Sequence, residues 1–170
     1  MDNLKFNRFI IIVTGEDRPG VLDDVCGVIQ RNSGTIQVIR SVDSGGQFAM
    51  LYGVAIAASA TEALCHQLDE FAGYSGLSVV CRPAADSRPV HQYRFVARGD
   101  DHTGVLKKIS HLLRVLSINV EEIQTQVEPD NRVTMTLLLG VPRECPVTKV
   151  KEFFAQLLGP IDMTWELTPA

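Results

Sequence analysis

The sequence predicts an α+β protein made of two copies of one βαββαβ unit, each an antiparallel sheet with helices on one face. The main observation is a repeat: the segment 15–22, GEDRPGVL, returns 84 residues later as GDDHTGVL at 99–106, with five of eight positions identical. Both copies follow a strand-type apolar run and open a helix-type apolar pattern. The order of elements around each copy is that of the ferredoxin-like sandwich.

The first half begins with a run rich in β-branched residues, which predicts a central strand buried on both faces. In the third predicted element, Ile36, Val38 and Val42 should share one face, because strand side chains alternate. The expected elements are strand 8–14, helix 21–29, strand 35–42, turn 43–46, strand 47–57, helix 61–72 and strand 76–82.

The second half repeats this order after a connecting segment. Residues 83–89 contain two prolines and little apolar surface, which indicates a linker. We therefore expect a first domain over 1–83, a linker over 84–90 and a second domain over 91–170. The expected elements of the second domain are strand 91–98, helix 105–113, strand 118–127, turn 129–131, strand 132–141, helix 146–158 and strand 161–167.

Composition limits the classes of function. The chain has 170 residues, of which 45% are hydrophobic and 21% charged, as in ordinary globular proteins. Its net charge of -4 argues against a basic nucleic-acid-binding surface. No apolar run approaches the roughly 18 residues of a membrane span, and the four cysteines lack zinc-finger spacing. We expect a cytoplasmic protein without a metal, a cofactor or a membrane contact.

The repeated turn has a chemistry that suits a small anion. Asp17 and Asp101 are placed to cap free backbone N–H groups of the following helix. Gly20 and Gly104 leave the start of that helix bare, and a helix N-terminus carries partial positive charge that favours a carboxylate or phosphate. The alternative is that these residues only form a tight turn and a cap.

The βαββαβ order with G-x-D-x-P-G-V-L at the first turn resembles the ACT domain family. A chain of two such domains is similar to the glycine cleavage system transcriptional repressor family. The resemblance implies a regulatory protein without catalytic residues, a homodimer, and an amino acid held at an interface between paired domains. A protein partner is also expected, and direct nucleic-acid contact is not.

The family's ligand loop corresponds to Gly15–Gly20. In the second copy His102 and Thr103 replace the arginine and the proline, which favours ligand binding by the first copy. The N–H groups at the helix start and Arg18 would receive a carboxylate, and Glu16 or Asp17 an ammonium. We expect the starts of the strands at 35 and 119 to lie beside the loop. The complete set of predicted ligand-binding residues is Gly15, Glu16, Asp17, Arg18, Pro19, Gly20, Val21, Thr35, Ile36, Asp101, His102, Gly104 and Asn119.

Other functions remain as alternatives. The same fold could act as a ligand-free module that docks on another regulator through a sheet edge. An enzyme is disfavoured, because no nucleophile, base and orienting group occupy plausible positions and no P-loop is present. RNA binding is disfavoured by scattered aromatic residues and by the net charge.

Overall fold

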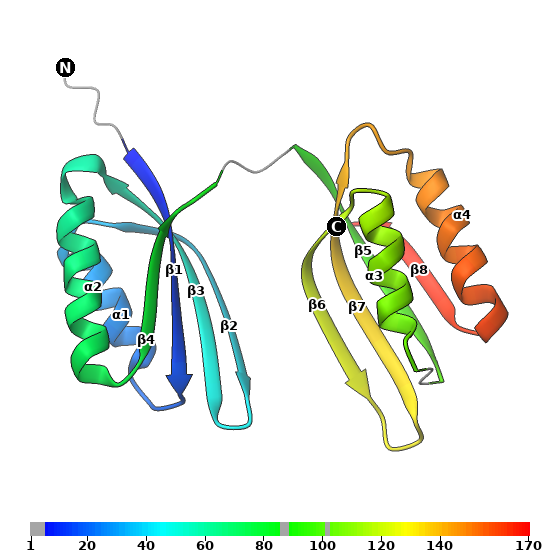
Figure 1. Cartoon of the computed structure of the whole chain (residues 1–170), viewed down its shortest axis with the longest axis horizontal. Helices are drawn as coiled ribbons and strands as arrows, with labels where there is room; N and C mark the ends of the chain where they lie inside the picture. Colours follow the sequence, from blue (N-terminus) through cyan, green and yellow to red (C-terminus); the bar gives the residue numbers. More distant parts are fainter. Residues whose placement is uncertain (1–5, 86–88, 101–102) are drawn as a thin grey trace. The chain divides into compact units, whose positions relative to one another are not determined.

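The computed structural model describes residues 6–85, 89–100 and 103–170, and within these ranges no helix is both long and apolar enough to cross a membrane. The chain divides into two compact units, Met1–Asp86 and Ser87–Ala170. Each unit contains a four-stranded antiparallel sheet with two helices on one face (Figure 1). The predicted fold class, two tandem βαββαβ domains, is confirmed.

The first domain has the strand order β2-β3-β1-β4, so β2 and β4 are its edges. Its helices bury alternate residues of β1 and β3, including Ile11, Val13 and Tyr52. Ile10 and Ile12 point to the other face and stay partly exposed, so the prediction that this strand is buried on both faces is wrong. The elements are β1 (Phe6–Glu16), α1 (Val21–Arg31), β2 (Thr35–Ser44), β3 (Gln47–Ala57), a 3-10 turn (Ala58–Ala60), α2 (Thr61–Ser75) and β4 (Ser78–Pro83).

The second domain has the equivalent order β6-β7-β5-β8. Its core centres on Phe95 and Phe154, whose stacked rings have centroids 4.1 Å apart, with Trp165 packed against them. The last strand begins three residues later than predicted, because Gly159–Ile161 forms a 3-10 turn. The elements are β5 (Val90–Asp100), α3 (Val105–Val115), β6 (Asn119–Val127), β7 (Arg132–Pro142), α4 (Val147–Leu158), the 3-10 turn and β8 (Thr164–Pro169).

Each domain has a β-bulge at the same place in an edge strand. The pairing of β2 with β3 shifts between Ile36 and Val38, and that of β6 with β7 shifts between Val120 and Glu122. A bulge re-aims the side chains that follow it. Ile36 consequently packs against the core whereas Val38 faces away from the helices, so the prediction that the two share a face is wrong.

The two sheets differ on the outer face, by which we mean the face without helices. The first outer face carries more apolar side chains than the second, and both faces also carry charged ones. Register and burial assign to the first outer face Arg8, Ile10, Ile12, Val38, Arg40, Val42, Leu51, Val80 and Arg82. They assign to the second Arg94, Val96, Arg98, Glu122, Gln124, Gln126, Thr134, Thr136, Leu138 and Glu166.

Candidate functional site

The loop after β1 is exposed from Glu16 to Gly20 and joins the end of the sheet to α1. The backbone N–H of Asp17 donates a 3.0 Å hydrogen bond to the carbonyl oxygen of Gly46. Gly46 belongs to the two-residue turn between β2 and β3, in which Gly45 and Gly46 both have positive φ. This bond fixes the loop beside the hairpin end of edge strand β2.

The first glycine of each loop serves packing. A Cβ on Gly15 would lie 2.5 Å from Leu77 Cδ2, and one on Gly99 would lie 2.8 Å from Met163 Cγ. Both distances are shorter than real side-chain contacts allow. The two glycines therefore allow the residue before the last strand of each domain to pass close to the backbone at the end of β1 or β5.

The last glycine of each loop starts a helix. Gly20 and Gly104 are the N-cap residues of α1 and α3, with φ of 95° and 85°, a conformation that favours glycine. Within the described part of the chain, no side chain caps the start of α1 or α3, so the prediction that Asp17 caps α1 is wrong. Asp101 and His102 lie outside the described residues. The first N–H groups of α1 are thus open to an acceptor, and Val21, its first residue, is buried.

The charges around the two helix starts are opposite. Arg18 Nη2 lies 3.0 Å from Asp24 Oδ2, and this partly exposed pair sits on the first turn of α1. Arg18 also donates to the carbonyl oxygen of Pro19 at 3.4 Å. In α3 the first turn has no acidic residue, and Lys107 and Lys108 follow its two apolar residues. The start of α3 is therefore the more positive of the two.

The strand starts lie at the other end of each sheet, contrary to our expectation. Gly15 pairs with Phe48 on β3, whereas Thr35 pairs with Ala55 and Ile36 with Val54. Seven residues of a strand span about 23 Å. Helix α1 runs the length of the domain before β2 begins. The loop and the start of β2 therefore lie too far apart for one small ligand to contact both within a single domain. Asn119 is placed in the same way, opposite Gly140.

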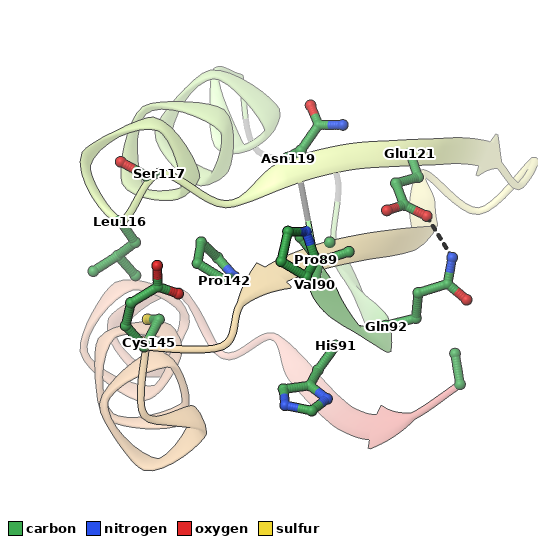
Figure 2. Close-up of a pocket in the computed structure, with 13 residues that line it drawn as sticks. Pro89, Val90, His91, Gln92, Leu116, Ser117, Asn119, Glu121, Pro142 and Cys145 are labelled. Atoms are coloured by element: carbon green, nitrogen blue, oxygen red, sulfur yellow. Dashed lines mark hydrogen bonds between the residues drawn. The ribbon is translucent and has the colours of Figure 1, made fainter. Parts of the chain in front are cut away.

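An open groove of about 1470 Å³ occupies that far end of the second domain (Figure 2). Glu121, the bulged residue of β6, accepts a 2.6 Å hydrogen bond from Gln92 Nε2. A Cβ on Gly140 would lie 2.6 Å from Glu121 Oε1, so the glycine makes room for this carboxylate. The groove is lined by Pro89, Val90, His91, Gln92, Leu116, Ser117, Asn119, Glu121, Gly140, Pro142, Glu144, Cys145 and Ala170.

Sequence reasoning named Asn119 as a residue beside the loop, not as part of this groove, and it did not name Gln92, Glu121 or Gly140. These three residues come from β5, β6 and β7, and only the strand register brings them together. No local motif marks them. Among the described residues, no group of three or more histidine, cysteine and acidic side chains is arranged to hold a metal ion.

The fold is a tandem of two βαββαβ domains. Residues 7–82 match the family model of the ACT domain, and the second domain repeats the topology of the first. No curated protein matches the sequence at a significant level.

Two solved structures share this fold along nearly the whole chain. An unknown protein from Galdieria sulphuraria is 20% identical with a TM-score of 0.82, covering 98% of this chain and 99% of its own. A proposed glycine cleavage system transcriptional repressor is 19% identical with a TM-score of 0.73, covering 96% of both chains. The chain has the tandem βαββαβ fold of these two proteins.

Proposed function

We propose that this chain is a non-enzymatic, cytoplasmic regulatory protein that binds an amino acid between paired domains and changes its association when the ligand is bound. The observation that carries the proposal is the loop Gly15–Gly20, which is exposed from Glu16 onward and leads into an uncapped helix start. The same turn recurs before α3. An uncapped helix start suits the carboxylate that every amino acid carries.

The separation of loop and strand start suggests how the domains would pair. If two edge strands such as β2 align antiparallel, the start of one strand reaches the end of the other. That end is where the hydrogen bond from Asp17 to Gly46 holds the loop. Edge strand β2 carries the exposed side chains of Val38 and Val42, which such pairing would cover. One ligand could then touch a loop and a strand start from different domains.

Each end of an amino acid would meet a suitable group. The backbone N–H groups at Gly20 and Val21 would donate to the carboxylate, and the exposed carboxylates of Glu16 and Asp17 would accept from the ammonium. Arg18 is paired with Asp24, so a ligand carboxylate would compete with Asp24 for the guanidinium. Because this pair is exposed, its separation costs at most about 1 kcal/mol.

Thermal unfolding against a panel of the twenty amino acids tests the proposal. A ligand at a hundredfold its dissociation constant adds about 2.7 kcal/mol to the free energy of unfolding. For a chain of this size the expected rise in Tm is about 5–10 °C. Sedimentation velocity with and without the active amino acid then reads the change in association.

Variants locate the site. Asp17→Ala should reduce the shift and Glu16→Ala combined with Asp17→Ala should remove it, because the ammonium then loses both acceptors, and Glu62→Ala on α2 is the matched control that should keep it. If no amino acid shifts the Tm of the folded protein, ligand sensing is wrong. A shift that survives the double replacement would place the ligand elsewhere, and the groove of the second domain is then the next site to mutate.

The second candidate is a ligand-free interaction module, and the exposed apolar side chains on the outer face of the first sheet favour it. Val42 is 60% exposed and Val80 is 36% exposed on that face. Exposed apolar patches commonly mark interaction surfaces. Val42→Lys and Val80→Lys should then lower the mass measured by light scattering without changing the Tm response to amino acids. A monomeric wild-type chain with a flat amino acid panel would require a different partner protein.

A further inference from the structure

Two cysteines of the first domain face each other from different elements. Cys65 lies on α2 and Cys81 on edge strand β4, and their Sγ atoms are 3.2 Å apart. Both are half-buried free thiols. A disulfide bond is about 2.05 Å long, so the sulfurs need to approach by only about 1 Å.

We propose that Cys65 and Cys81 form a reversible disulfide that ties α2 to β4. The two thiols already touch through packing of their elements, which places them for bond formation. The other two cysteines lie elsewhere, Cys26 on α1 and Cys145 before α4 in the second domain. We therefore expect the disulfide to form between Cys65 and Cys81 and to be independent of the loop Gly15–Gly20.

The oxidant we name is a small disulfide such as glutathione disulfide. Burial, followed by the hydrogen bond from Cys65, raises the pKa of Cys81 to about 12, so Cys81 stays a thiol at neutral pH. The Cys65 thiolate attacks one glutathione sulfur, forms a mixed disulfide and releases glutathione. Cys81 then gives up its proton and attacks Cys65 Sγ, which releases the second glutathione. Two protein thiols are oxidised, one glutathione disulfide is reduced, and two protons pass to the products.

The bond would hold the last strand of the first domain. Strand β4 pairs only with β1 and leads directly into the segment between the domains. Hydrogen bonds to a neighbouring strand therefore hold β4 in the sheet on one side only. The cross-link closes a loop between residues 16 apart, which restricts the unfolded chain. We expect the oxidised first domain to melt on the order of 10 °C higher than the reduced one.

The test uses the full chain, reduced and then incubated with glutathione disulfide. Remaining thiols are alkylated and counted by mass spectrometry, and linked peptides are mapped without reductant. Two of the four thiols should disappear, the Cys65 and Cys81 peptides should be linked, and dithiothreitol should restore all four. The Tm of the first domain should rise on oxidation and fall again on reduction.

Matched variants assign the bond. Cys65→Ser and Cys81→Ser should keep their three thiols free of any internal link, whereas Cys26→Ser and Cys145→Ser should still lose two. Cys65→Ala replaces Cys65→Ser if the serine variant fails to fold by far-UV circular dichroism. The proposal is overturned if the wild-type chain keeps four thiols while an exposed dithiol peptide is oxidised. It is equally overturned by a link to another cysteine, by a persistent glutathione adduct, or by an unchanged Tm.

Discussion

The two domains bury nearly the same pattern of residues on the helix side of their sheets, yet their outer faces differ in polarity. The first outer face presents Ile10, Ile12 and Leu51 at its centre, whereas the second presents Arg94, Thr136 and Glu122 around Val96 and Leu138. Side chains under the helices must pack, so the fold constrains them. Side chains on the outer face pack under no helix, so the fold does not constrain them in this way. The outer faces of the two sheets therefore differ more in polarity than the buried faces do.

The two loops differ in the same way. Gly20 and Gly104 both have positive φ, and Gly15 and Gly99 both pack against the residue that precedes the last strand of their domain. Around them, however, Arg18 pairs with Asp24 in the first domain, and Lys107 and Lys108 stand in the second. The turn is thus a feature of the fold, and the charges beside it decide what it can bind.

The largest expected effect tests whether the two cores are independent. Phe154→Ala should lower the free energy of unfolding of the second domain by about 3–5 kcal/mol, because a stacked ring is lost from a full core. Trp165 is the only tryptophan, and its ring centroid lies 5.8 Å from that of Phe154, so its fluorescence reports the second domain.

The first domain should keep its own transition, followed by circular dichroism in the same sample. Leu68→Ala in the first core is the reciprocal control, and it should leave the midpoint of the Trp165 signal unchanged. If either variant shifts both transitions equally, the comparison of two separate domains fails, and the chain unfolds as one cooperative unit.

A smaller effect compares the two packed glycines. Gly99→Ala should destabilise the second domain by about 1–3 kcal/mol, because its Cβ would lie 2.8 Å from Met163 Cγ and 3.2 Å from Met163 Cα. Gly15→Ala should cost less, since the near atom is the end of the Leu77 side chain and Leu77 Cα is 3.7 Å away. Urea denaturation of both variants measures the difference. Equal losses would mean that the two turns are packed equally tightly.

The smallest effect is an alkaline loss of stability in the first domain. Burial, with a smaller contribution from Cys26, raises the pKa of Tyr52 from 10.0 to about 12. Burial and the hydrogen bond with the Cys65 thiol raise the pKa of Cys81 from 9.0 to about 12 in the reduced protein. The unfolded chain then releases protons that the folded domain keeps, so stability is full below about pH 9 and falls toward pH 12.

For fully buried Tyr52 the slope above pH 10 is at most about 1.4 kcal/mol per pH unit, and for half-buried Cys81 it is smaller. Calorimetry of the first transition between pH 8 and pH 11 measures it. Tyr52→Phe should flatten the slope above pH 10. A slope that is the same in this variant would show that Tyr52 ionises normally in the folded domain.

Hydrophobic periodicity and the repeated turn were enough to predict the order of the elements and both sheets. Periodicity works for these features because each helix and strand buries a stripe of its own side chains. It failed at Ile36 and Val38, because one bulged residue reverses the alternation and leaves no mark in the hydrophobic pattern. It also failed for β1, because the apolar side chains of Ile10 and Ile12 on the outer face cannot be told in sequence from the buried side chains of Ile11 and Val13.

The site was predictable only as a local motif. The loop Gly15–Gly20 is contiguous in sequence, so its exposure and its helix start followed from residue types. Thr35 and Asn119 were predicted at the wrong end of their sheets. The end of the sheet at which a strand begins depends on the length of the preceding helix and on strand pairing. The pairs formed by Gln92 with Glu121 and by Cys65 with Cys81 join residues from separate elements, and no spacing rule connects them.

The sequence by itself determined that this protein is two copies of one βαββαβ domain, because periodicity, turns and a repeat are local properties of the chain. The tertiary structure alone decided which side chains meet across elements. It separated loop from strand start, opened the groove at Gly140 and brought two thiols into contact. These contacts depend on register, bulges and helix length together, and a shift of one residue in a strand turns every side chain to the opposite face.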